Sequence, residues 1–247
     1  MASVPVKFPR THHLIDTGAA TRDDLVLDRG IAQHMIQSRV ICEEKVDGSN
    51  LGLSFDENWN LRAQKRGHWV TSVSEAQYAK LDGWIKKHRA SLFDVLGQDR
   101  ILYGEWLCAR HTVTYDQLPD WFLAFDIYDK TRKCFLSRSM RDELLKETSI
   151  YSVRCVTERA FQSLDEVFQL MLHERSAYAE NEPIEGIYIR LENRDGTLLD
   201  RAKLVRPDFI QIVNSSMHWS KQNTIGNSLR PDLWDTPLEI YHRQYEQ

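Results

Sequence analysis

One lysine stands between a strand-like segment and a short turn, in the run Glu43-Glu44-Lys45-Val46-Asp47-Gly48-Ser49-Asn50. The residues before the run are rich in β-formers, and residues 51–55 alternate as a second strand would. Asp47 and Gly48 therefore predict a tight, hairpin-type connection between two strands. A lysine on such rigid backbone could act as a covalent nucleophile. Taken alone, the pattern is more typical of an exposed lysine at a sheet edge.

Three later strand-like segments each contain a carboxylate. Glu105 interrupts an apolar run, Asp126 follows Phe125, and Glu185 precedes Gly186 at the head of a strand. A carboxylate within an apolar strand is costly to bury unless it is hydrogen-bonded, paired or bound to a metal. Strand alternation predicts that Phe125 and Asp126 point to opposite faces of their sheet.

Basic residues accompany two of the predicted strands. Lys65 and Arg66 end one strand, and Arg201 and Lys203 are two residues apart on another. A period of two places Arg201 and Lys203 on one face, where they would suit a polyphosphate. The alternative is an exposed strand with surface ion pairs, which contribute little to stability.

In this order the segments resemble the motifs of the covalent nucleotidyltransferase superfamily, which contains ATP-dependent ligases and capping enzymes. The resemblance covers residues 40–209 and is closest to the RNA ligase family, whose phage members seal nicks in RNA. It rests on Lys-x-Asp-Gly at Lys45, Gly-Glu at Glu105, Phe-Asp at Phe125, Glu-Gly at Glu185 and basic-x-Lys at Lys203. The fuller run 44–50, with Arg66 at the next matching position, indicates RNA ligases in particular. The sequence contains no Gly-x-x-x-x-Gly-Lys phosphate loop, which excludes a P-loop enzyme.

The resemblance implies that Lys45 attacks the α-phosphorus of ATP, releases pyrophosphate and holds AMP as a phosphoramidate. The AMP would pass to a 5'-phosphate RNA end, and a 3'-hydroxyl would then displace it and close the strand. A free lysine is almost fully protonated near neutral pH, so its pKa must be lowered by burial, cations or a metal. We expect the pKa of Lys45 to be lowered by Arg201, Lys203 and bound Mg²⁺ or Mn²⁺.

The resemblance also implies roles for individual residues. The expected catalytic residues are Lys45, Asp47, Arg201 and Lys203. ATP would be bound by Glu44, Lys45, Arg66, Glu105 at the ribose, Phe125 on the adenine, Glu185, Arg201 and Lys203. RNA would be bound by Asn50 and Arg66, and the metal by Glu185 and Asp126.

Three other functions share parts of this pattern. A minimal DNA ligase and a capping-type guanylyltransferase would use the same lysine chemistry. A non-catalytic nucleotide- or RNA-binding homologue is the third, although the presence of Lys45, Glu105, Glu185 and Lys203 together argues against it. Two departures are visible: Arg201 stands where many relatives have lysine, and Asp47 where some phage RNA ligases have histidine.

These residues need a scaffold of strands and helices. Strands are expected at 38–45, 50–56, 61–65, 100–107, 121–128, 184–191 and 198–205. Helices are expected within 21–37 and at 74–96, 139–147 and 164–173, the last capped by Ser163. Adjacent strands with helices inserted between groups predict an α+β fold of mostly antiparallel sheets with flanking helices, as in an ATP-grasp-like nucleotidyltransferase domain.

Composition sets the remaining expectations. The chain has 247 residues, 42% hydrophobic and 28% charged, as in an ordinary globular protein. We expect an adenylyltransferase domain over 1–209 and a short helical extension over 210–247 without an oligonucleotide-binding barrel. The four cysteines show no Cys-x-x-Cys spacing, so we expect free thiols and a cytoplasmic location. No run approaches a transmembrane length, so we expect no membrane contact. We also expect a monomer. A net charge of −4 gives no global attraction to RNA, so a local basic patch must bind it.

Overall fold

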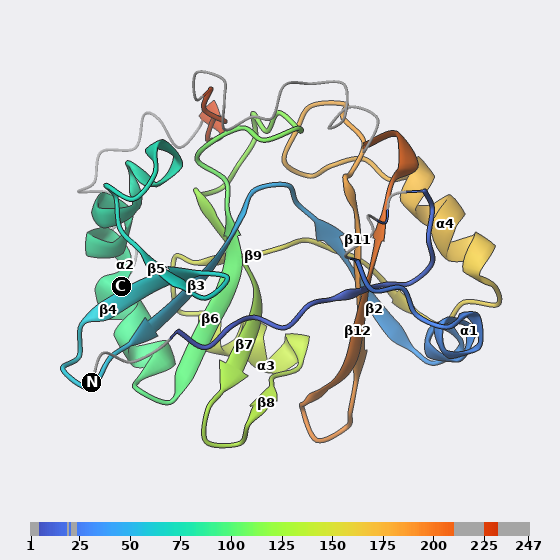
Figure 1. Cartoon of the computed structure of the whole chain (residues 1–247), viewed down its shortest axis with the longest axis horizontal. Coiled ribbons are helices and arrows are strands. Elements are labelled where there is room, and N and C mark those ends of the chain that lie inside the picture. Colours follow the sequence, from blue (N-terminus) through green and yellow to red (C-terminus); the bar gives the residue numbers. More distant parts are fainter. Residues whose placement is uncertain (1–4, 19, 21–23, 210–224, 232–247) are drawn as a thin grey trace.

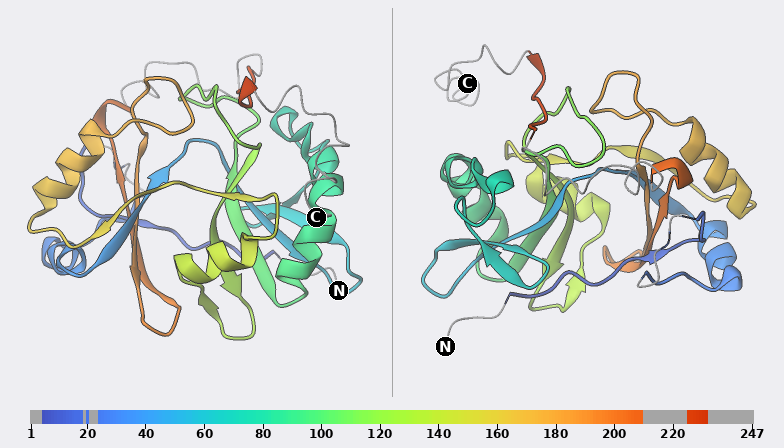
Figure 2. Two further views of the ribbon diagram at one scale, coloured as in Figure 1. Left: turned by 180° about the vertical axis from the view of Figure 1, so that it is seen from behind. Right: turned by 45° about the horizontal axis from the view of Figure 1, so that its top comes forward.

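The computed structural model describes residues 5–18, 20, 24–209 and 225–231. Two mostly antiparallel sheets lie side by side, and three of the four α-helices that the structure describes cover their outer flanks (Figure 1, with further views in Figure 2). The expected α+β class is confirmed. The predicted helical extension over 210–247 falls outside the described residues, except for 225–231.

The first sheet contains the strand that ends at Lys45. Its order is β1-β12-β11-β2-β10, with β1 (His12–His13), β2 (Val40–Lys45), β10 (Cys155–Arg159), β11 (Gly186–Glu192) and β12 (Leu198–Val205). Its outer face packs against α1 (Arg29–Gln37) and α4 (Leu164–His173). As expected, the Ser163 side chain caps α4 by accepting a hydrogen bond from the Glu166 N–H.

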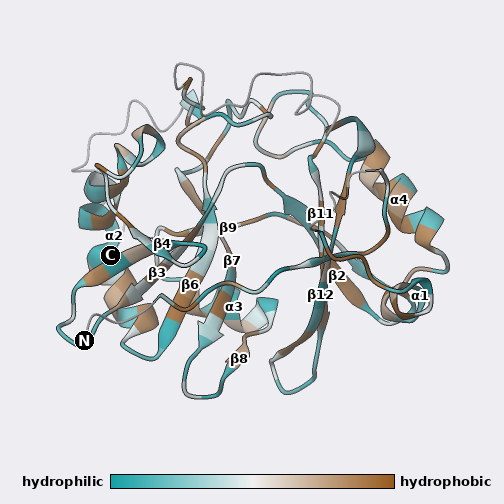
Figure 3. Ribbon diagram, in the orientation of Figure 1, coloured by the Kyte–Doolittle hydropathy of each residue, from teal (hydrophilic) through white to brown (hydrophobic). Residues whose placement is uncertain are grey.

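The second sheet has the order β5-β4-β3-β6-β7-β8. Its strands are β3 (Ser49–Phe55), β4 (Leu61–Lys65), β5 (His68–Val70), β6 (Arg100–Trp106), β7 (Phe122–Asp129) and β8 (Cys134–Phe135), with β9 (Tyr151–Ser152) parallel to β7. Helix α2 (Leu81–Leu96) covers its outer flank, whereas α3 (Arg138–Leu145) lies between the second sheet and the first (Figure 1). Hydrophobic and hydrophilic residues alternate along α2 and α4 (Figure 3), as expected of helices with one buried face.

The predicted hairpin at Asp47 and Gly48 is wrong. Strand β2 pairs with β10 and β11, whereas β3 pairs with β4 and β6, so the turn carries the chain from one sheet into the other. Both edges of each strand are already occupied, which leaves no room for pairing between β2 and β3. The crossing backbone passes close to β6: a Cβ on Gly48 would lie 2.5 Å from the Trp106 carbonyl oxygen.

The expectation that Phe125 and Asp126 face opposite sides is also wrong. Tyr103 pairs with Asp126 and Gly104 with Ala124, so Phe125 is an extra residue between paired neighbours, a β-bulge. The bulge resets the alternation of β7. Both side chains therefore reach the space between the two sheets.

The helix expected over 74–96 is divided in two. A 3₁₀ turn, η1 (Ala76–Tyr78), precedes α2, and Gly83 lies inside regular helix. The indole N–H of Trp106 donates to the Gln77 carbonyl at 2.7 Å. In a continuous α-helix that carbonyl would accept from the N–H of Leu81, so this tertiary contact ends the first turn.

The N-terminal segment, residues 5–11, crosses from one sheet to the other (Figure 1). The Val6 carbonyl accepts hydrogen bonds from Gln64 and Tyr103 of the second sheet, and β1 pairs with β12 of the first. The four cysteines, all described, form no disulfide. Within the described ranges, no helix has the length and hydrophobicity needed to cross a bilayer.

Candidate active site

A cavity of about 600 Å³ lies between the two sheets. Walls come from both sheets and from residues 7–11 of the N-terminal segment. Most of the sequence-predicted site residues border it: Glu44, Lys45, Asp47, Asn50, Arg66, Glu105, Phe125 and Lys203. Sheet topology thus gathers side chains that are widely separated along the chain.

Lys45 projects from the end of β2 and is held by Glu185. The Nζ atom donates to both carboxylate oxygens of Glu185, at 2.6 and 2.7 Å. Gly186 lies directly opposite Lys45 in the β2–β11 pairing, and a Cβ there would lie 2.2 Å from the Leu204 carbonyl oxygen. The glycine of the Glu-Gly pair is therefore needed for the close approach of β11 to β12.

The carboxyl groups around Lys45 bind protons more tightly than usual. Burial raises the pKa of Glu105 to about 8 and that of Glu185 to about 7, although the charge of Lys45 opposes both shifts. Burial lowers the pKa of Lys45, but the charges of Glu185 and Glu105 outweigh it, so the net pKa is raised. The structure thus holds Lys45 as an ammonium ion.

The cations expected to lower the pKa of Lys45 are engaged elsewhere. Lys203 borders the cavity and donates to Asp24 at 2.9 Å. Arg201 donates to Asp126 at 3.0 Å, and its guanidinium lies 3.9 Å from the ring centre of Phe135. Arg201 is not part of the cavity wall, so the expectation that it binds phosphate beside Lys203 is not supported by this geometry.

Asp126 is fully buried and also lies outside the cavity wall. Its carboxylate accepts hydrogen bonds from Arg190, from Arg201 and, at 2.8 Å, from the Tyr188 hydroxyl. Two guanidinium groups neutralise it and occupy its oxygens. The expectation that Asp126 binds a metal is therefore not supported either.

Asp47 organises the loop that follows β6. Its Oδ2 atom accepts hydrogen bonds from the Thr112 and Val113 N–H groups at 2.7 and 3.1 Å. Its own N–H donates to the Tyr115 hydroxyl at 2.8 Å. This side chain shapes the cavity wall next to Lys45.

Glu44 borders the cavity, but its side chain points to the opposite face of β2 from Lys45. The carboxylate is buried and accepts hydrogen bonds from Arg154 at 3.0 Å, Ser176 at 2.5 Å and the Ala177 N–H at 3.1 Å. Asn50 lies opposite Glu105 in the β3–β6 pairing, and Arg66 is exposed at the end of β4.

Several cavity residues were not expected from the sequence. Tyr188 follows Gly186 by two residues on β11, so strand alternation could have predicted that Tyr188 lies on the same face of the strand as Gly186. Phe8 packs 5.3 Å from the ring of Phe125. Gln77 lies in the 3₁₀ turn η1, where the expected α-helical periodicity does not hold. His111 lies in the loop after β6, where no periodic pattern indicates which way a side chain points.

The fold is shared with solved ligases. It resembles the Naegleria gruberi RNA ligase with pyrophosphate, at a TM-score of 0.62 and 16% identity, over 87% of this chain and 62% of that one. A mutant of the same ligase with ATP and Mn has a TM-score of 0.57 and 14% identity, over 85% of this chain and 63% of that one. A putative ATP-dependent DNA ligase from Aquifex aeolicus has a TM-score of 0.54 and 17% identity, over 81% of this chain and 50% of that one.

The sequence shows the family. The family model described as RNA ligase matches residues 38–205, more than half of the chain, so the chain belongs to the RNA ligase family. Among curated proteins, none matches the chain. The chain spans less than two thirds of the length of the solved ligases reported above.

Proposed function

We propose that this protein is an ATP-dependent RNA ligase that forms lysyl-AMP at Lys45. The observation that carries the proposal is the position of Lys45. Its ammonium group lies in the wall of a cavity that also contains an aromatic ring, Phe125, and a lysine, Lys203. An aromatic ring suits a nucleobase and a cation suits phosphates, so the three side chains together match the parts of ATP.

In the first step, the neutral amine of Lys45 attacks the α-phosphorus of ATP. A nitrogen–phosphorus bond forms, the bond to the pyrophosphate oxygen breaks so that pyrophosphate leaves, and one proton passes from the nitrogen to water. Phosphoryl transfer depends mainly on in-line positioning and charge neutralisation. Lys45 on a rigid strand end meets the first requirement, and Lys203 contributes to the second.

In the later steps, AMP passes to the 5'-phosphate end of RNA, and a 3'-hydroxyl displaces it. Arg66, Asn50 and His68 border the cavity on the side of the second sheet. We infer that RNA phosphates enter there, because Arg66 is exposed and guanidinium groups bind phosphate through paired hydrogen bonds.

The carboxylates do not fit a metal site held by the protein. No group of three or more potential ligands occurs in the part of the chain that the structure describes. Both oxygens of Glu185 accept hydrogen bonds from Lys45. The oxygens of Asp126 accept hydrogen bonds from two arginines and from the Tyr188 hydroxyl. Mg²⁺ or Mn²⁺ is therefore proposed only as a companion of the ATP phosphates, and no step is assigned to it.

A DNA ligase is the second candidate, because a putative DNA ligase from Aquifex aeolicus shares the fold. A panel of nicked duplexes and single strands, in RNA and DNA with 5'-phosphate and 3'-hydroxyl ends, separates the two. Sealing of DNA but not RNA would contradict the RNA assignment. Label transfer from α-labelled GTP in place of ATP would indicate capping-type chemistry instead.

The test of the first step uses purified protein, α-labelled ATP and Mg²⁺ or Mn²⁺. Intact mass spectrometry should show one added AMP on the wild type and on Lys146→Ala, an exposed control lysine. Lys45→Ala should show none. A wild type without the adduct, or an equal adduct on Lys45→Ala, would show that the proposal is wrong, and the protein would then be a non-catalytic homologue or use another residue.

A further inference from the structure

The carbonyl oxygen of Phe125 is bound by two buried arginines. Arg141 donates to it through Nη1 at 2.6 Å, and Arg190 through Nη1 at 3.0 Å. Phe125 is the extra residue of the β-bulge in β7, so its backbone is not part of a regular residue pair with β6. Two charged donors therefore stabilise the irregular backbone of β7 at the residue, Phe125, whose side chain borders the cavity.

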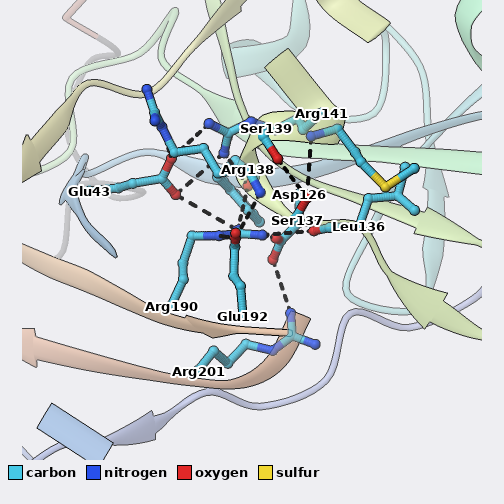
Figure 4. Close-up of polar contacts among 12 residues, drawn as sticks. Glu43, Asp126, Leu136, Ser137, Arg138, Ser139, Arg141, Arg190, Glu192 and Arg201 are labelled. Atoms are coloured by element: carbon cyan, nitrogen blue, oxygen red, sulfur yellow. Dashed lines mark hydrogen bonds and ion pairs between the residues drawn. The ribbon is translucent and has the colours of Figure 1, made fainter. Parts of the chain in front are cut away.

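Both arginines are anchored by groups from other elements. Arg141, on α3, also donates to Glu43 at 2.7 and 3.3 Å. Arg190, on β11, also donates to Asp126, to Glu192 at 2.7 Å and to the Leu136 carbonyl at 2.8 Å. Figure 4 shows Arg190 among Glu43, Asp126 and Glu192, with Arg201 reaching Asp126 from β12.

This set of contacts links the strand of Phe125 to the strand of Lys45. Glu43 precedes Lys45 by two residues on β2, so the two side chains share a face. Arg141 bridges the Glu43 carboxylate and the Phe125 carbonyl directly. Arg141, Arg190 and Glu43 have no exposed surface. Buried ion pairs are poor sources of net stability, but their directional hydrogen bonds can select one arrangement.

We propose that Arg141 and Arg190 are positioning residues: they hold the bulge so that the Phe125 ring stays at a fixed place relative to Lys45. The planar, multidentate guanidinium suits this task, because it can bind a carbonyl and a carboxylate at once. The inference rests on the proposed function. It assigns to the network the alignment of the nucleobase with the attacking nitrogen, and leaves the chemistry itself to Lys45.

The test is a double-mutant cycle between Arg141→Lys and Phe125→Ala. Adenylate formation is followed by intact mass at increasing ATP concentrations, which gives the half-saturating concentration and the rate at saturation. Phe125→Ala is expected to raise the half-saturating concentration by about tenfold, since stacking on an aromatic ring contributes substantially to nucleobase binding. Arg141→Lys is expected to raise it by about fivefold, with less than about a twofold change in the saturated rate.

The decisive variant is the double mutant. If Arg141 acts through Phe125, Arg141→Lys should have almost no further effect once the ring is absent. Arg39→Lys is the matched control, because Arg39 makes an exposed ion pair with Glu158. Equal effects of Arg141→Lys in both backgrounds, or no effect in either, would overturn the inference while leaving the proposed function intact.

Stability is measured first by thermal unfolding. If Arg141→Lys is unfolded at the assay temperature, Glu43→Gln replaces it in the same cycle, since glutamine keeps the shape and one acceptor oxygen for Arg141. The same non-additivity with Phe125→Ala is expected, and additivity would again overturn the inference. A wild type that forms no adenylate would overturn the proposed function and this inference together.

Discussion

Lys45 donates from one nitrogen to both oxygens of Glu185, a residue 140 positions further along the chain. The pair fixes the lysine at the cavity wall, and it also keeps the nitrogen protonated. A protonated amine is not a nucleophile, so the contact that places Lys45 would also restrain the proposed attack on ATP.

The first prediction concerns the pH dependence of adenylate formation. The net pKa of Lys45 is raised above its ordinary value of 10.5, so only a small fraction is neutral near pH 7. That fraction, and the single-turnover rate, should rise between about pH 7 and about pH 9, by less than about tenfold per pH unit, because Glu185 and Glu105 ionise in this range and their charges hold the proton on Lys45. Intact mass at timed intervals measures the rate. A flat profile would show that loss of this proton does not limit the reaction.

The second prediction concerns Glu105 and stability. Its folded-state pKa, about 8, exceeds the ordinary 4.5, so the folded protein binds this proton more tightly than the unfolded chain. The contribution of Glu105 to the free energy of unfolding of the wild type should therefore fall as the pH rises from 4.5 to about 8. Glu105→Gln lacks this ionisation. Its melting temperature should gain on that of the wild type between about pH 5 and about pH 8, and a constant difference would contradict the assignment.

The third prediction concerns the N-terminal segment. Phe8 packs against Tyr103, Phe125 and Phe135, with ring centres 5.0, 5.3 and 5.5 Å away. Phe8→Ala should release this wall of the cavity and speed tryptic cleavage after Lys7 and Arg10 by about tenfold, because local opening becomes easier. Val73→Ala, at a side chain 91% exposed, is the control and should match the wild type. Equal cleavage of all three proteins would mean that Phe8 does not anchor the segment.

The fourth prediction compares two glycines. Gly186→Ala places a Cβ 2.2 Å from the Leu204 carbonyl oxygen, opposite Lys45, and should lower the free energy of unfolding by about 2 kcal/mol or more. Gly83→Ala, inside α2 with no atom other than the neighbouring helix backbone within 4 Å of the new Cβ, should raise it by about 0.5–1 kcal/mol. Urea titration measures both. A neutral Gly186→Ala would show that β11 and β12 can separate at this point.

Two local predictions from the sequence were wrong for reasons that lie elsewhere in the chain. The turn at Asp47 and Gly48 has the composition of a hairpin turn, yet β10 and β11 occupy both edges of β2. The bulge at Phe125 depends on how β7 pairs with β6, and its carbonyl is bound by Arg141 and Arg190. Neither pairing is visible in a short window of residues.

The sequence by itself determined most of the strands, the flanking helices and the order of the motif residues, including Lys45, Glu105 and Glu185. Side-chain alternation, turn residues and helix caps depend on chain neighbours, so a linear reading can detect them. Only the tertiary structure decided that Glu185 holds Lys45 and that Arg190 and Arg201 pair with Asp126 away from the cavity. Burial and charge pairing depend on which distant strands become neighbours, and these contacts determine which charged groups remain available for a ligand.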